Sequence, residues 1–169
     1  SAISDDKGLY FINPLGKEKN KPMQIWTQGE PESNSVWFPT IDKPNERCTQ
    51  EIAMTVQNRF MAMSNGKFVS DIDNADGTHT VSWQQYKPHA PYLFMMTIGE
   101  FAQIKDEWEG MSVDYFVEKE YENVAREIFG ETPAMLSFFS DQLGVRYPWD
   151  KYWQVCVRDY VSGAMENTS

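Results

Sequence analysis

Cysteine and histidine are scarce in this chain of 169 residues. Its two cysteines, Cys48 and Cys156, lie far apart in the sequence. This spacing argues against a disulfide framework and favours two buried free thiols. Its two histidines, His79 and His89, form no H-E-x-x-H pair, and no cysteine or histidine has the spacing of zinc ligands. We therefore expect no bound zinc or other metal in this chain.

Long apolar runs and an excess of positive charge are also lacking. No stretch approaches the roughly 18 consecutive apolar residues of a transmembrane helix, so we expect no membrane span in this chain. The 25 acidic residues outnumber the 15 lysines and arginines, which leaves a net charge of −10. Nucleic acids and anionic membrane surfaces would repel such a chain, and both are excluded as expected partners.

Several motifs of enzyme active sites are missing. The sequence has no G-x-G-x-x-G pattern and no phosphate-binding loop. No serine stands in a G-x-S-x-G elbow, although the residue types alone leave a Ser-His-Asp arrangement open.

What is present is enough for a packed core, since 41% of the residues are hydrophobic and 14% are aromatic. From about 47 to 118 apolar residues alternate with polar ones, in the sets Ile52-Met54-Val56, His79-Val81-Trp83 and Met111-Val113-Tyr115-Val117. Ser64-Asn65-Gly66 and residues 73–77 are typical of hairpin turns. The fold class that we predict is mainly β with a smaller α/β part, beginning with an antiparallel β saddle or sandwich.

The pattern changes near residue 119. Residues 122–129 are predicted to form a short helix, and Thr132-Pro133 to cap a second helix that Gly144 ends. Its apolar face is interpreted as core and comprises Met135, Leu136, Phe139 and Leu143. Residues 153–161 alternate as a strand does and lead to Gly163.

Two acidic segments are candidates for ligand binding, although acids in turns are often only solvated. The first is Thr27-Gln28-Gly29-Glu30, and the second is Gly163-Ala164-Met165-Glu166-Asn167. Small residues let another backbone approach closely, and Glu166 adds a carboxylate beside them. This combination suits an extended peptide held by its main chain and its terminal ammonium. The chain stops at Ser169, and we expect it to be a fragment that ends just after a substrate-binding element.

Together these segments resemble the aminopeptidase N family of zinc metallopeptidases, the gluzincins with a G-A-M-E-N exopeptidase motif. The matches follow the family's order: T-Q-x-E at 27–30, F-P-C-x-D-x-P at 38–44, S-N-G at 64–66, Y-P-x-x-K-Y at 147–152 and G-A-M-E-N at 163–167. They cover nearly the whole chain. It departs from the family at Thr40, where the family often has cysteine, and at Thr168-Ser169 after the signature.

The resemblance implies that residues 1–118 are part of the family's N-terminal β saddle domain. Residues 119–169 would be the truncated beginning of its thermolysin-like catalytic domain, with the rest of that domain as a partner. The parent would be a zinc aminopeptidase that removes N-terminal residues from peptides, with its zinc motif downstream, so the isolated fragment is predicted to be inactive. The implied substrate-binding residues are Gln28, Glu30, Gly163, Ala164, Met165, Glu166 and Asn167.

Two alternatives remain open from the sequence. A non-catalytic member of the same fold would serve as a peptide-binding or scaffold module. An unrelated acidic β-sandwich used for adhesion would leave residues 120–169 unexplained.

Overall fold

The computed structural model describes residues 7–169, which are mainly β with antiparallel sheets and short helices, as the predicted fold class requires. The chain packs as two compact units. The first comprises residues up to 100 together with 157–168, and the second comprises residues 101–156 with Ser169. These units are defined by packing alone, and the domain boundary near residue 119 stays a prediction.

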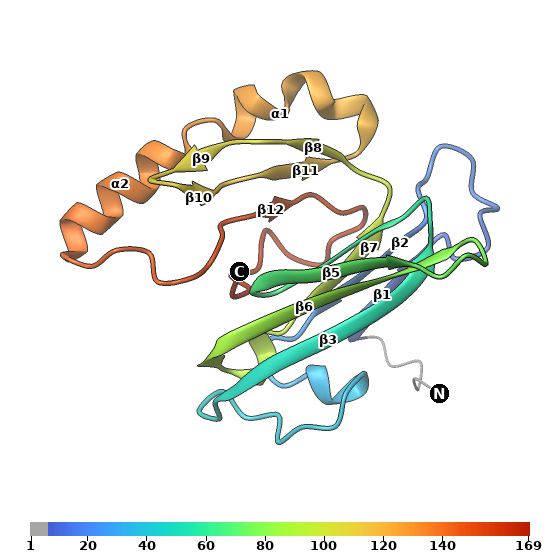
Figure 1. The fold of residues 1–169 in the computed structure, drawn as a ribbon, viewed down its shortest axis with the longest axis horizontal. Helices are drawn as coiled ribbons and strands as arrows, with labels where there is room; N and C mark the ends of the chain where they lie inside the picture. The colour runs from blue at the N-terminus through green and yellow to red at the C-terminus, as the bar shows by residue number, and fades with distance from the viewer. Residues whose placement is uncertain (1–6) are drawn as a thin grey trace. The chain divides into compact units, whose positions relative to one another are not determined.

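The first unit contains a four-stranded antiparallel sheet in the order β1-β2-β7-β4. Its strands are β1 (Gly8–Ile12), β2 (Gln24–Gln28), β7 (Met96–Gly99) and β4 (Met61–Ser64). A second antiparallel sheet has the order β3-β6-β5 and consists of β3 (Cys48–Gln57), β6 (Thr78–His89) and β5 (Lys67–Asp73). Figure 1 shows β3, β5 and β6 lying across β1, β2 and β7.

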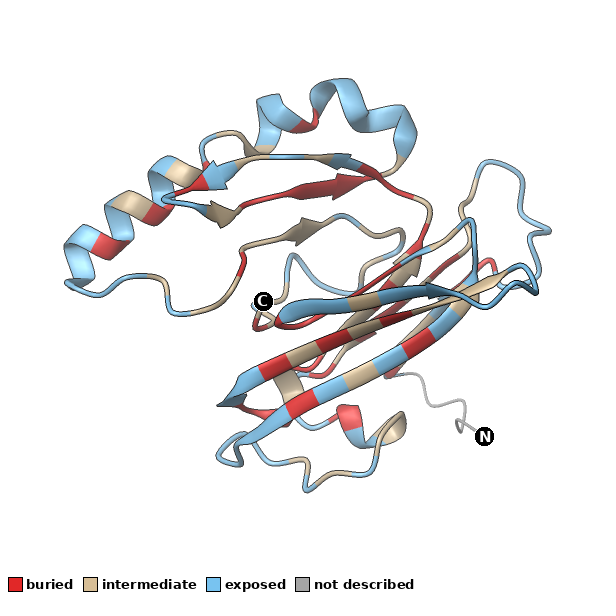
Figure 2. Cartoon of the chain, in the orientation of Figure 1, coloured by how far each residue is buried: buried red, intermediate tan, exposed pale blue. Residues whose placement is uncertain are grey.

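Burial alternates along the long strands, as the period-two pattern predicts. Figure 2 shows this alternation on β3 and β6, where Met54, Val81 and Trp83 are buried between more exposed neighbours. Buried polar groups then link the two sheets. The indole Nε1 of Trp83 donates a hydrogen bond to the Ala62 carbonyl, at 3.0 Å. The amide of Gln50 donates another to the Ser64 hydroxyl, at 2.8 Å.

The two predicted turns have different roles. The turn at 73–77 joins β5 to β6, its neighbour in the same sheet, as predicted. The turn Ser64-Asn65-Gly66 forms no hairpin, because β4 and β5 belong to different sheets and do not pair. It carries the chain from one sheet to the other, and Gly66 adopts a positive φ of 77° there.

The second unit is built on a small mixed sheet in the order β12-β11-β8. Its strands are β8 (Ala102–Ile104), β11 (Tyr115–Val117) and β12 (Gln154–Val155), beside a hairpin of β9 (Glu107–Trp108) and β10 (Met111–Ser112). Helices α1 (Glu122–Phe129) and α2 (Thr132–Leu143) follow. Short 3-10 turns occupy Asn34–Val36, Pro91–Leu93 and Lys119–Tyr121. Residues 111–117 are thus two strands, where the sequence pattern predicted one.

Helix α2 differs from its prediction in two ways. Thr132 lies inside the first turn, and its hydroxyl lies 2.7 Å from the Phe129 carbonyl oxygen, so it is not the N-cap. Of the predicted core face only Leu136 is buried, and Met135, Phe139 and Leu143 are exposed. The C-terminus is as predicted, with Gly144 in the left-handed conformation.

Both cysteines are exposed free thiols, which makes the prediction of burial wrong. Cys48 begins β3 at the edge of its sheet, and Cys156 directly follows β12. Across residues 7–169, no helix has the length and apolar character to cross a membrane.

Candidate functional site

The segment 157–168, which carries most of the candidate residues, is irregular and belongs to the first unit. A strand was predicted over 153–161, but pairing ends at Val155. Two features explain this difference. The Arg158 N–H bonds to a side chain of β2, and Asp159 adopts a positive φ of 57°, which interrupts an extended backbone.

Strand β2 contacts this segment through every second side chain. The Arg158 N–H donates a hydrogen bond to Gln24 Oε1 at 2.8 Å, and Trp26 Nε1 donates one to the Arg158 carbonyl at 3.1 Å. Gln28 Nε2 donates to Met165 Sδ at 3.7 Å. Because side chains two apart share one face of a strand, the segment follows β2 in the same direction along that face.

Aromatic rings add an apolar contact to these hydrogen bonds. The Tyr10 and Trp26 rings stack with their centroids 4.0 Å apart, and the Tyr160 ring lies tilted against Trp26 at 4.9 Å. Tyr10 pairs directly with Trp26 across β1 and β2, which explains the stack. Trp26 is almost fully buried beneath these contacts.

The other end of the segment is attached to the sheet by Asn65. Its buried side-chain Nδ2 donates hydrogen bonds to the carbonyls of Thr168 and Leu93, while its Oδ1 accepts one from the Met95 N–H at 2.8 Å. The sequence pointed to Asn65 only as part of a turn. The contact between Trp26 and Tyr160 was not predicted either. The side chains of Gln24, Trp26 and Gln28 share one face of a strand, and this pattern could have indicated a contact surface.

Between these attachments the backbone is open. Gly163 and Ala164 are exposed, and a Cβ added to Gly163 would meet no atom within 4 Å. The Ser162 hydroxyl donates a hydrogen bond to the Ala164 carbonyl at 3.2 Å. The Oδ1 of Asn167 is buried and accepts no hydrogen bond from the described residues. An extended chain could therefore approach the Gly163–Ala164 backbone without a steric barrier.

The two candidate carboxylates, Glu30 and Glu166, are exposed, and the charges of both act on one hydroxyl group. Burial, followed by the charges of Glu166, Tyr10 and Glu30, raises the pKa of Tyr160 to about 12. Both carboxylates therefore act on the same phenol, although they are far apart in the sequence. The structure thus brings Gln28 to Met165, and the charges of Glu30 and Glu166 both affect Tyr160.

Gly29 allows the turn that carries Glu30. A Cβ at this position would overlap the Tyr92 carbonyl oxygen and the Asn34 side chain. Asn34 cannot easily move aside, because its Nδ2 donates to the carbonyls of Pro91 and Phe94 at 2.6 and 2.9 Å. The position therefore requires glycine for close packing.

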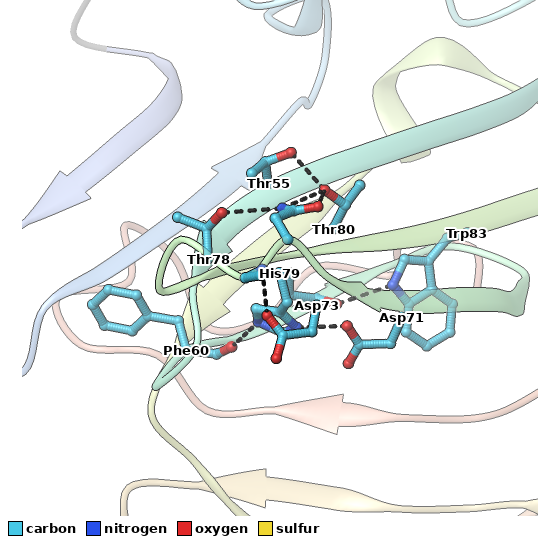
Figure 3. Close-up of polar contacts among 11 residues, drawn as sticks. Thr55, Phe60, Asp71, Asp73, Thr78, His79, Thr80 and Trp83 are labelled. Atoms are coloured by element: carbon cyan, nitrogen blue, oxygen red, sulfur yellow. Dashed lines mark hydrogen bonds and ion pairs between the residues drawn. The ribbon is translucent and has the colours of Figure 1, made fainter.

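A second polar cluster surrounds His79 on β6. Figure 3 shows its ring between Asp71 and Phe60, with Nδ1 2.6 Å from Asp71 Oδ1 and Nε2 2.9 Å from the Phe60 carbonyl oxygen. The pKa of His79 is raised: burial lowers it, but the Asp71 carboxylate and the Phe60 carbonyl outweigh that effect. Both ring nitrogens are occupied, so this arrangement stabilises the sheet and offers no free base.

The residues present do not fit a zinc site. Among residues 7–169, no group of three or more histidine, cysteine, aspartate or glutamate side chains is placed to hold a metal ion. A metal ion that takes part in a reaction would have to be held by residues other than these.

Comparison of the sequence with known proteins identifies relatives of this chain. The profile of the Peptidase M1 N-terminal domain matches residues 3–93, and that of the Peptidase family M1 domain matches 127–169. Glutamyl aminopeptidase of Bos taurus is 25% identical over 161 residues, and endoplasmic reticulum aminopeptidase 1 of Homo sapiens is 27% identical over 161 residues. Aminopeptidase M1 of Arabidopsis thaliana is 26% identical over 162 residues. Each alignment covers 95% of this chain but only 17% or 18% of the relative.

Proposed function

Because this chain belongs to the peptidase M1 family, we propose that it is the part of a zinc-dependent aminopeptidase that binds the N-terminal end of the peptide substrate. The observation that carries the proposal is the contact of Gln28 with Met165, because Gln28 lies two residues before Glu30 and Met165 lies next to Glu166. The charges of both carboxylates also act on the same Tyr160 hydroxyl, although one follows β2 and the other belongs to the segment 157–168. Two carboxylates whose charges act on one group suit a substrate ammonium group.

Each candidate residue has a role in this proposal. Glu30 and Glu166 bind the α-ammonium, and the Gln28 amide adds a polar contact beside them. Gly163 and Ala164 pair with the substrate backbone as an added strand does, since their exposed main chain has space around it. Met165, held by Gln28, and Asn167 complete the binding segment.

Hydrolysis itself requires the remainder of the catalytic domain, which is this chain's proposed partner. In the complete protein a bound zinc ion would supply Lewis-acid activation of the scissile peptide. The residues of this chain would orient the substrate so that cleavage falls after its first residue.

Carboxylate variants of the complete protein test the proposal. Glu166→Ala and Glu30→Ala should each lower kcat/KM by roughly 30- to 1,000-fold, or about 2–4 kcal/mol, because the ammonium loses a charged partner. Gln variants keep the side-chain shape and Asp variants keep the charge, so the two sets separate charge from reach. Glu51→Gln on β3 is the control, because Glu51 is an exposed acid outside the proposed site.

If Glu30 and Glu166 only cap turns, their Ala variants would lose thermal stability but keep their rate per folded molecule. That result would contradict the proposal. Peptide binding without any turnover in the unmodified complete protein would instead favour a non-catalytic binding module.

A further inference from the structure

Asn65 uses the full hydrogen-bonding capacity of its amide on the backbone. It is 1% exposed, and its two donor hydrogens go to the carbonyls of Leu93 and Thr168. Its oxygen accepts from the Met95 N–H. Leu93 and Met95 lie just before β7, so Asn65 joins Thr168 to the four-stranded sheet.

Thr168 comes two residues after Glu166, and the segment is also attached at its beginning. There, Gln24 and Trp26 bind the N–H and the carbonyl of Arg158. The stretch 163–166, in which all residues but Met165 are exposed, therefore lies between two backbone attachments that both come from the sheet. Loss of either attachment would widen the range of positions open to the Glu166 carboxylate.

We propose that Asn65 is a positioning residue for recognition of the substrate α-amine, because its amide fixes Thr168 and thereby the place of Glu166 and the Gly163–Ala164 backbone. This inference rests on the proposed function. Asn65 itself need not touch the substrate. Its effect should therefore be selective for ligands that carry the α-amine and should leave the chemical step largely unchanged.

Asn65→Asp in the complete protein is the direct test. The substitution keeps the shape and the acceptor for Met95 but replaces the donor that faces Thr168 and Leu93. The probes are a competing dipeptide and its desamino analogue, compared by their inhibition constants. We expect the inhibition constant of the dipeptide and KM to rise about tenfold, while kcat and the inhibition constant of the desamino analogue change less than about twofold.

Asn13→Asp is the matched control. Asn13 is also buried, donates to two carbonyls, those of Glu18 and Lys21, and accepts from the Glu18 N–H. Asn13→Asp should cost comparable thermal stability without the selective loss of amine binding. If Asn65→Asp does not fold, Trp26→Phe takes its place, because it removes the Nε1 donor to Arg158 while keeping a ring for the aromatic stack.

The outcomes are distinguishable. Equal weakening of both ligands, no weakening, or the same selective loss in Asn13→Asp would overturn the role of Asn65 while the proposed function stands. An unmodified complete protein without aminopeptidase activity would overturn the proposed function and this inference with it. In the 169-residue chain, Asn65→Asp should also accelerate hydrogen exchange of the amides of 163–168, and Asn13→Asp should not.

Discussion

At the scale of single residues, His79 makes the stability of the chain depend on pH. Burial lowers the pKa of its ring, but Asp71, the Phe60 carbonyl and the charge of Asp73 outweigh that effect and raise the pKa above the ordinary value of 6.5. A raised pKa means that the folded state binds the proton more tightly, so this stabilisation is fully present below pH 6.5 and is lost as pH rises through the folded pKa. Urea unfolding at pH 6 and pH 8.5 should show this loss, and His79→Gln should abolish it.

His89 acts in a different pH window and with the opposite sign. Burial, and then the charge of Arg47, lower its pKa to about 4. Between pH 6.5 and 4 only the unfolded state takes up this proton, so stability should fall as pH falls, by at most about 3 kcal/mol. Acid unfolding that is the same for the unmodified chain and for His89→Phe would contradict this.

Gly29 is a residue whose replacement should be costly for steric reasons. Gly29→Ala would push a methyl group into the Tyr92 carbonyl and the hydrogen-bonded Asn34 side chain, at a cost of about 1–3 kcal/mol. Thermal or urea unfolding of the chain measures it. Gly163→Ala is the control, since its added Cβ meets no atom within 4 Å and should leave stability nearly unchanged.

At the scale of elements, helix α2 is stabilised by few of its apolar side chains. Leu136 is buried in a cluster with Trp108, Val113 and Tyr115, whereas Leu143 is 72% exposed. Leu136→Ala should therefore lower the free energy of unfolding by about 2–3 kcal/mol, and Leu143→Ala by less than about 0.5 kcal/mol. Urea unfolding compares them. Equal costs would mean that Leu143 is covered in solution.

At the scale of the whole molecule, we expect the 169-residue chain to bind no stoichiometric zinc and to cleave no peptide. None of the described residues group as a metal site, and catalysis is proposed to need the remainder of the catalytic domain. Metal analysis and an aminoacyl-chromogen assay measure both properties. One tightly held zinc ion per chain, or turnover that persists through repurification, would show the expectation to be wrong.

The sequence by itself determined the features that depend on near neighbours. Alternation along β3 and β6 followed from the requirement that one face of each strand be buried, and Gly144 ended α2 because it accepts a positive φ. The ordered motifs also identified the family, since they are read directly from residue identities.

Tertiary structure decided the contacts between residues that are distant in the sequence. The same Ser64-Asn65-Gly66 pattern that suits a hairpin instead joins two sheets, and only packing places Asn65 against Thr168. Likewise the strand predicted over 153–161 gave way to contacts of Arg158 with β2. Such contacts join residues more than a hundred positions apart. No local periodicity in the sequence predicts them, because they stabilise the chain only when the sheet has formed.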